Sequence, residues 1–206
     1  MPVSVVMLGH KAQVGKDTLG EFLVSELGYL RFGFADKLKE VVADLYDFNH
    51  EQMYGELKNT PDKRYLLHPE VPNCTKSFYT PRMILQYFGQ EQRARFPDIW
   101  ADYVCRQIES HLDPEDNVVE LAGGSGFVIT DFRFPNEAAV AERYCKKLNI
   151  NLVQIKITRP DEYRGNFAGS MDVSETALDD YEDWDYHIHN DGTIPELFEK
   201  YLNLGI

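Results

Sequence analysis

The sequence of 206 residues contains few cysteines and no long apolar segment. Its three cysteines, Cys74, Cys105 and Cys145, are far apart and match no zinc-binding or redox spacing, so we expect buried, reduced thiols. No apolar run approaches the roughly 20 residues of a membrane-spanning helix. These absences exclude a disulfide-rich scaffold and a membrane protein, and they favour a cytoplasmic location.

Basic residues are scarce as well. The 21 Lys and Arg residues face 34 Asp and Glu residues, which gives a formal net charge of −13. A protein that binds a nucleic-acid polymer usually neutralises many phosphates with a basic face, so this balance argues against such a partner. A small phosphorylated ligand needs only a few cations in one pocket, and it is therefore the better candidate partner.

Apolar patterns predict alternating strands and helices in this chain, of which 43% is hydrophobic. The predicted strands are 3–8, 29–34, 127–130, 151–158 and 186–189. The predicted helices are 16–27, 36–46, 81–88, 98–112, 136–148 and 193–202. This alternation predicts an α/β fold with a doubly wound, five-stranded parallel sheet and helices on both faces. The polar stretch 49–80 is expected to be irregular, and 114–126 to be a turn-rich connection.

The segment after the first predicted strand is typical of a phosphate-binding loop. Backbone N–H groups of such a loop point at the phosphates, and the dipole of the following helix favours negative charge. Gly15 allows close approach, and Lys16 supplies a point charge for the β- and γ-phosphates of a nucleoside triphosphate. The residues assigned to this ATP site are Gly9, His10, Lys11, Ala12, Gln13, Val14, Gly15, Lys16, Asp17 and Thr18.

The loop departs from the pattern G-x-x-x-x-G-K-[ST] in two ways. Five residues separate Gly9 from Gly15, so His10 stands where a glycine is expected. Asp17 stands where Ser or Thr usually ligates magnesium, and Thr18 follows one residue later, an arrangement that resembles the Gly-Lys-Gly-Thr of adenylate kinases. The alternative interpretation is an ordinary strand–turn–helix connection with a solvated Lys16.

A second polar cluster follows the strand predicted at 127–130. Asp131 at the end of this strand could hold Mg²⁺ directly or through water, and Arg133 could bind a phosphate with both arms of its guanidinium group. The alternative is structural: Asp131 would cap the next helix and Arg133 would pair with Glu137. Because parallel strands end at one edge of a sheet, Gly9, Asp131, Arg159 and Asn190 are expected to converge there.

The order and spacing of several motifs resemble those of the bacteriophage deoxynucleoside monophosphate kinases, which are P-loop nucleotide kinases. The similar pieces span most of the chain and include Gly15-Lys16-Asp17-Thr18, Phe34-Ala35-Asp36-Lys37-Leu38-Lys39, Thr80-Pro81-Arg82, Leu85-Gln86-Tyr87-Phe88-Gly89, Pro97-Asp98-Ile99-Trp100, Asp131-Phe132-Arg133-Phe134-Pro135-Asn136-Glu137, Arg159-Pro160, Ser174-Glu175 and Asn190-Asp191-Gly192. The resemblance implies one P-loop kinase domain over 1–206, with a mostly helical monophosphate-binding insert at about 49–112 and a lid at about 159–180. It also suggests a homodimer, in the host cytoplasm if the source is viral.

The resemblance further implies transfer of the γ-phosphate of ATP, with Mg²⁺, to a (deoxy)nucleoside 5′-monophosphate. Positioning and charge neutralisation would provide the catalysis. The implied catalytic residues are Lys16, Asp131, Arg133 and Arg159. Thr18 and Asp131 are implied as magnesium ligands, and Arg159, Asn190 and Gly192 as further ATP contacts. The implied acceptor contacts are Phe34, Ala35, Asp36, Lys37, Arg82, Gln86, Trp100, Arg133 and Glu175.

Several alternatives stay open at this point. Gln86 follows Arg82 by one helical turn and could read a base edge, or it could simply face solvent. Trp100 could stack on a base, although an aromatic residue at helical spacing is more often part of a core. The acceptor could be another phosphorylated metabolite of the dephospho-coenzyme A kind. The chain could also be a nucleotide-binding regulatory module without kinase activity.

Overall fold

The computed structural model describes residues 3–67, 78–112, 126–163 and 172–206. Cys74, nearly all of the predicted connection 114–126, and parts of the predicted insert and lid lie outside these ranges. The chain divides into two compact units, one formed by 1–34 together with 100–206 and the other by 35–99. Each unit is described by itself.

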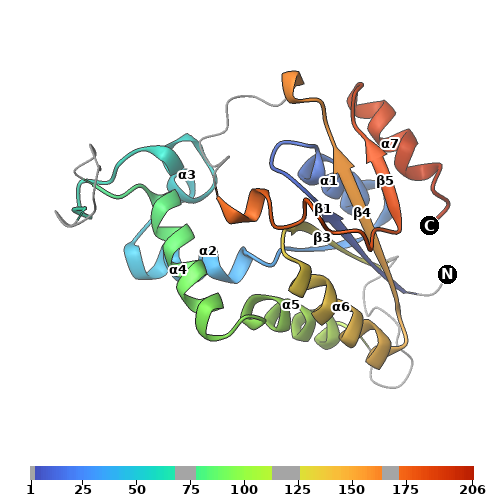
Figure 1. The fold of residues 1–206 in the computed structure, drawn as a ribbon, viewed down its shortest axis with the longest axis horizontal. Helices are drawn as coiled ribbons and strands as arrows, with labels where there is room; N and C mark the ends of the chain where they lie inside the picture. Colours follow the sequence, from blue (N-terminus) through green and yellow to red (C-terminus); the bar gives the residue numbers. More distant parts are fainter. Residues whose placement is uncertain (1–2, 68–77, 113–125, 164–171) are drawn as a thin grey trace. The chain divides into compact units, whose positions relative to one another are not determined.

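The first unit contains a five-stranded, entirely parallel sheet. Its strands are β1 (Ser4–Gly9), β2 (Leu30–Phe32), β3 (Gly126–Phe132), β4 (Asn151–Thr158) and β5 (Tyr186–His189). They are ordered β2-β3-β1-β4-β5, so the chain crosses over between neighbouring strands (Figure 1). The predicted doubly wound α/β fold is confirmed, although β2 is shorter and β3 longer than expected.

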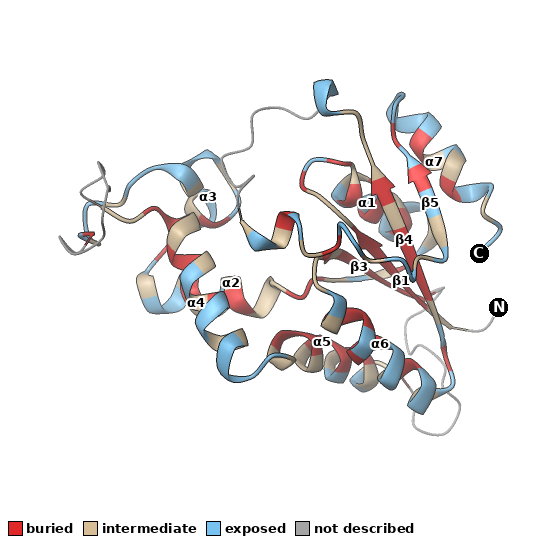
Figure 2. Ribbon diagram, in the orientation of Figure 1, coloured by how far each residue is buried: buried red, intermediate tan, exposed pale blue. Residues whose placement is uncertain are grey.

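Helices cover both faces of this sheet because its central strand, β1, is apolar on both sides. On β1, Val5 and Met7 pack into one core cluster, while Val6 and Leu8 pack into the other, as the alternation of a strand requires. Helices α5 (Ile99–Ser110) and α6 (Pro135–Leu148) contribute to the first cluster, and helices α1 (Lys16–Leu27) and α7 (Ile194–Leu202) to the second. Figure 2 shows the resulting buried strands between helices whose outer faces are exposed.

The second unit is mostly helical. It contains α2 (Asp36–Tyr46), α3 (His50–Met53), the 3₁₀ turn η1 (Glu56–Asn59) and α4 (Pro81–Arg95). Thr80 caps α4 as predicted, because its hydroxyl accepts a hydrogen bond from the N–H of Met83 at 3.2 Å. The prediction that this helix ends at about Phe88 is wrong. Gly89 is buried within the helix, where a side chain would crowd Leu38 of α2.

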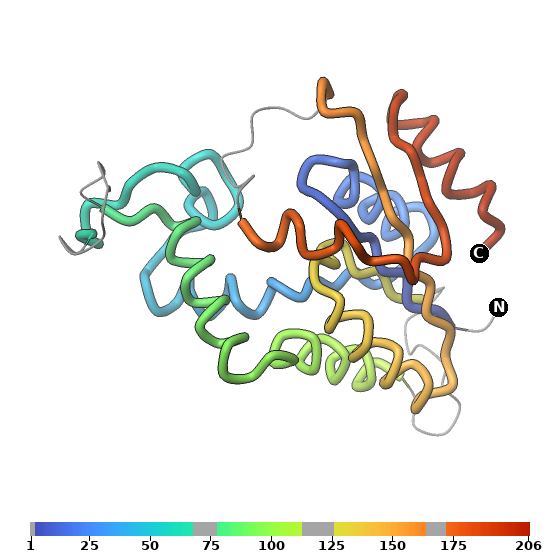
Figure 3. The backbone as a smooth tube through the Cα atoms, in the orientation of Figure 1, coloured from blue at the N-terminus to red at the C-terminus, as the bar shows by residue number. Residues whose placement is uncertain are grey.

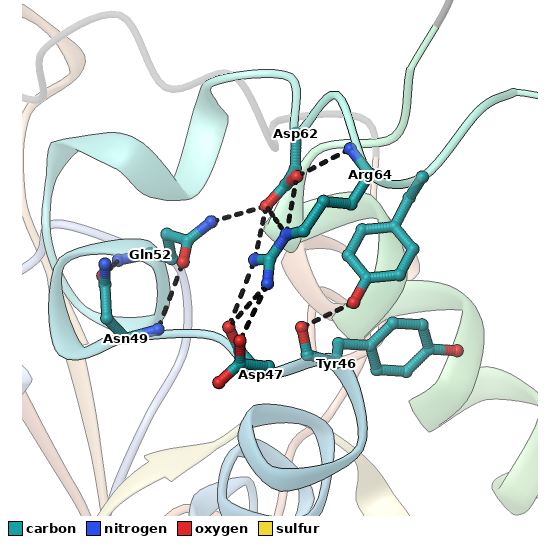
Figure 4. Close-up of polar contacts among 7 residues, drawn as sticks. Tyr46, Asp47, Asn49, Gln52, Asp62 and Arg64 are labelled. Carbon is teal, nitrogen blue, oxygen red and sulfur yellow. Dashed lines mark hydrogen bonds and ion pairs between the residues drawn. The ribbon is translucent and has the colours of Figure 1, made fainter.

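Arg64 anchors the polar loop around residues 62–65, which lies in the stretch 49–80 that we expected to be irregular. Its guanidinium group binds Asp62 at 2.8 Å and Asp47 at 3.1 Å (Figure 4). Hydrogen bonds from Arg64 hold the pKa of Asp62 at about 2, well below its ordinary value. The hydroxyl of Tyr65 donates to the carbonyl of Tyr46 at 2.6 Å, which ties the same loop to the end of α2.

Two expectations about composition are met within the described ranges. Cys105 and Cys145 are free, buried thiols, and burial raises the pKa of each to about 12, which leaves them unreactive at neutral pH. Among the helices in these ranges, none combines the length and apolar character that a membrane crossing requires.

Candidate phosphate-binding site

The loop between β1 and α1 adopts the left-handed backbone turns that a phosphate cradle needs. Gly15 has a φ of 105°, and the non-glycine residues His10 and Gln13 have φ values of 92° and 60°. His10 therefore takes a glycine-like conformation despite its side chain, at a cost of about 1–3 kcal/mol. At Gly9, by contrast, only glycine fits, because a Cβ there would collide with the rings of Trp184 and Phe132.

Lys16 lies at the start of α1 and is almost completely buried, with 5% of its surface exposed. Its ammonium group donates to the carbonyl of His10 at 3.1 Å and to the carbonyl of Lys11. The pKa of Lys16 is lowered to about 7, mainly by burial and also by the positive charge of Arg133, while Asp17, Glu175 and Asp131 oppose the shift. A cation held this way gains strongly from the arrival of an anion.

The end of β3 and the residues after it lie close to Lys16. A carboxylate oxygen of Asp131, near the end of β3, accepts the N–H of Phe34 at 2.7 Å, which ties the segment after β2 to β3. Glu137 accepts the backbone N–H groups of Arg133 and Phe134, at 2.8 and 3.0 Å, and so fixes this turn. The guanidinium group of Arg133 instead binds Glu175 at 2.7 Å. The alternative in which Glu137 pairs with this guanidinium group is therefore replaced by a backbone contact.

A short segment before β5 lies against the phosphate loop. Glu175, in the 3₁₀ turn η3 (Val173–Glu175), accepts the backbone N–H of Ala12 at 2.8 Å. Asp179 contacts Lys11 at 3.1 Å and the imidazole of His10 at 3.5 Å. Burial and nearby lysines lower the pKa of His10 to about 4, so its imidazole is neutral at pH 7. The sequence alone assigned no role to Asp179.

Asn190, directly after β5, holds the phosphate loop by a hydrogen bond. Its side-chain amide donates to the carbonyl of Val14 at 2.9 Å, and its backbone N–H donates to the carbonyl of Thr158 at 2.7 Å. The residue is 5% exposed. The sequence prediction that Asn190 contacts ATP stays a prediction, and in the structure its side-chain amide holds the loop.

We expect Asn190→Ala to lower the free energy of unfolding by about 1–3 kcal/mol, because the buried carbonyl of Val14 would lose its partner. Urea unfolding would measure the change. Asn203→Ala is the matched control, since Asn203 is exposed at the end of α7, and it should change stability by less than about 0.5 kcal/mol. Equal stabilities for the two variants would contradict the anchoring role of Asn190.

The other predicted residues of the first unit have varied settings. Phe34 is 1% exposed in the core, and Trp100 is 6% exposed on α5, so both side chains are buried. Arg159 follows β4 and stacks its guanidinium group over the ring of Tyr163, at 5.9 Å from the centroid. Thr18 is half-buried on α1 while Asp17 is exposed. Gly192 lies in the exposed bend before α7.

The remaining predicted residues belong to the second unit. Ala35 precedes α2, Asp36 and Lys37 form its first turn, and Lys37 pairs with Glu40 at 2.7 Å. Gln86 is half-buried on α4. Arg82, also on α4, donates to the side-chain carbonyl of Asn59 at 2.6 Å, which brings it beside η1.

A cluster of cations surrounds this contact, and it was not predicted from the sequence. Lys58 on η1 lies close enough to Lys39 of α2 and Arg82 of α4 for their positive charges to lower its pKa. Burial, together with these two neighbouring positive charges, lowers the pKa of Lys58 to about 8. In the part of this unit that the structure describes, no ion pair or hydrogen bond satisfies the ammonium group of Lys58. The ammonium group of Lys39 makes two longer contacts: it lies 3.7 Å from a carboxylate oxygen of Asp36 and 5.0 Å from the ring centroid of Tyr54.

Comparison with known proteins adds a relative and a fold. No protein-family model matches the chain. A protein of Acanthamoeba polyphaga mimivirus named "Putative deoxynucleotide monophosphate kinase" is 31% identical over 206 residues, which cover 98% of this chain and 95% of that protein.

Two solved structures share the fold at low sequence identity. TT1252 from Thermus thermophilus has a TM-score of 0.52 at 12% identity, with 99% of this chain and 96% of that chain covered. A sugar kinase from Janibacter sp. HTCC2649 has a TM-score of 0.50 at 14% identity, with 98% and 94% covered. At such identities the likeness concerns the fold alone.

Proposed function

Because this chain belongs to the family of P-loop deoxynucleotide monophosphate kinase-like proteins, we propose that it transfers the γ-phosphate of ATP to a (deoxy)nucleoside 5′-monophosphate. The observation that carries the proposal is the burial of Lys16 in a phosphate-type loop, within the electrostatic reach of Arg133 and Asp131. Burying a cation is costly, and buried groups with perturbed pKa values cluster at functional sites, so this cation supports a site that binds an anion.

The proposed donor site uses the loop and the two strand ends. Lys16 would turn from the carbonyls of His10 and Lys11 to the β- and γ-phosphates, and the anion would raise its pKa so that it stays protonated. Arg133 would stabilise charge on the transferring group. Phosphoryl transfer needs no covalent nucleophile from the protein, so holding these charges in place is the main contribution of the chain.

Mg²⁺ would supply charge neutralisation on the phosphate oxygens when bound. It usually keeps several waters and takes only one or two protein oxygens beside those of the phosphates. The carboxylate of Asp131 and the half-buried hydroxyl of Thr18 fit that sparse set. The described residues contain no group of three or more His, Cys, Asp or Glu arranged to hold a metal by themselves.

The cation cluster of Lys39, Lys58 and Arg82 supports a phosphorylated acceptor. A monophosphate carries nearly two negative charges at neutral pH, and Arg82 can bind it through paired N–H groups. Gln86 lies one turn further along α4 and would be available to a base edge. We assign this cluster, all within the second unit, to the phosphate of the acceptor.

A coupled assay of ADP release, with each deoxy- and ribonucleoside monophosphate in turn, tests the proposal. We expect turnover that requires both ATP and a monophosphate. Turnover only with a phosphorylated metabolite of the dephospho-coenzyme A kind would replace the acceptor class. ATP binding without turnover on any acceptor would favour a regulatory module, and hydrolysis that needs no acceptor would also defeat the kinase proposal.

A further inference from the structure

Glu175 makes a two-sided contact at the phosphate loop. One carboxylate oxygen accepts the N–H of Ala12 at 2.8 Å, and the other binds the guanidinium group of Arg133 at 2.7 Å. Its side chain is 5% exposed. Figure 3 follows the chain of this segment from η3 to β5. A buried carboxylate thus bridges a loop N–H and the cation assigned to the transferring phosphate.

The donors that Glu175 occupies are those that phosphates use. Backbone N–H groups of a loop before a helix N-terminus are anion ligands, and a guanidinium group binds phosphate as readily as carboxylate. Arg133 and Lys16 also repel each other, and Glu175 offsets this repulsion. Without Glu175, Arg133 would lose its buried carboxylate partner, and only Asp17 and Asp131 would offset the charge of Lys16, which is unfavourable in a buried setting.

A triphosphate bound at this loop would therefore compete with Glu175 for the N–H of Ala12 and the guanidinium group of Arg133. Two anions that share the same donors repel each other strongly where solvent is excluded. We propose that Glu175 is an internal counter-ion, which occupies part of the phosphate site in the nucleotide-free protein and is displaced from Ala12 and Arg133 when nucleotide binds. This inference rests on the proposed function, since it takes the competing anion to be the phosphate chain of ATP.

Asp179 makes a second contact between the same segment and the phosphate loop. Asp179 binds Lys11 on the loop, four residues after Glu175 in the same short segment. Its side chain is 41% exposed, so this contact is the weaker of the two. Glu175 provides the buried contact and Asp179 an outer one, and displacement of the first is expected to loosen the second.

Glu175→Gln tests the inference directly. Glutamine keeps an oxygen for the N–H of Ala12 but removes the charge that competes with phosphate. Calorimetric titration with a non-hydrolysable ATP analogue should show tighter binding by about 5-fold or more, as expected when a competing interaction is lost. The matched control is Glu182→Gln, an exposed glutamate of the same region, which should leave the affinity unchanged.

A gain in affinity separates a counter-ion from other roles. A residue that contacts nucleotide or merely supports the fold would give unchanged or weaker binding when altered, and either result for Glu175→Gln would overturn the inference. In an Arg133→Met background the gain should shrink, because the paired cation is gone. If Glu175→Gln fails to fold, Asp179→Asn should still tighten binding, by less, and its failure to do so would also count against the inference.

Failure of the proposed function would look different. If neither the wild-type protein nor Glu175→Gln binds the analogue, the donor site itself is wrong and the counter-ion falls with it. If the wild-type protein binds the analogue and turns over a monophosphate while Glu175→Gln binds no better, the proposed function stands and only the counter-ion is rejected.

Discussion

Lys16→Met is expected to lower phosphotransfer by about 10³-fold or more, because the loop would lose its point charge for the developing phosphate charge. Methionine keeps most of the side-chain length, so the packing of α1 against the sheet should survive. Turnover at saturating ATP and monophosphate measures the effect. Lys147→Met is the control, because Lys147 is an exposed lysine paired with Glu109 at 2.6 Å, and it should retain full turnover.

The same variant carries a prediction about stability against pH. The pKa of Lys16 is about 7 in the folded protein and near its ordinary 10.5 in the unfolded chain. Between these values the unfolded chain binds more protons, so the stability of the folded state rises with pH across this window.

The free energy of unfolding of the wild-type protein should therefore rise by up to about 3 kcal/mol between about pH 7 and pH 9.5, relative to that of Lys16→Met. Urea unfolding at several pH values measures this difference. Lys147→Met should follow the wild-type curve. Normal turnover in Lys16→Met would refute the assignment of Lys16 to the phosphates, and parallel pH curves would show that its ammonium group is not destabilised by burial.

The architecture of the sheet was predictable because it depends on local patterns. The bounds of α1, α2, β4 and β5 match the prediction, since the apolar periodicity that defines each of them is local to the element. The errors occur where tertiary contacts override that pattern. Polar Asp131 suggested the end of a strand, yet β3 continues to Phe132, and Asp131 satisfies its carboxylate with the N–H of Phe34.

The candidate site was predictable in its residue types but not in its connections. Glu175 and Ala12 are 163 positions apart, and Asn190 and Val14 are 176 apart, so no spacing rule could pair them. The resemblance drew attention to Glu175 and Asn190 as ligand contacts, while the structure shows both holding the loop. Lys58 lies in a polar stretch without periodicity, and only the packing of η1 beside α4 reveals that it faces Arg82.

The acceptor cluster leads to the second large effect. Arg82→Met should raise the KM for the monophosphate by about 10- to 100-fold, the usual loss when a charge-assisted hydrogen bond to an anion is removed. The affinity for the ATP analogue should stay near that of the wild-type protein, because the variant lies outside the proposed donor site. The control is Arg143→Met, an exposed arginine paired with Asp102 at 2.9 Å, which should leave both constants unchanged.

Lys58 gives this prediction a pH dependence. Its pKa of about 8 means that the cluster loses a positive charge as pH rises through that value, so the KM for the monophosphate should increase above about pH 8. Bound phosphate would shift the transition upward, since an anion favours the charged lysine. In Lys58→Met the KM should be high at every pH and lack this transition. If Lys58→Met keeps the wild-type profile, or if Arg82→Met affects ATP rather than the monophosphate, the cluster is not the acceptor site.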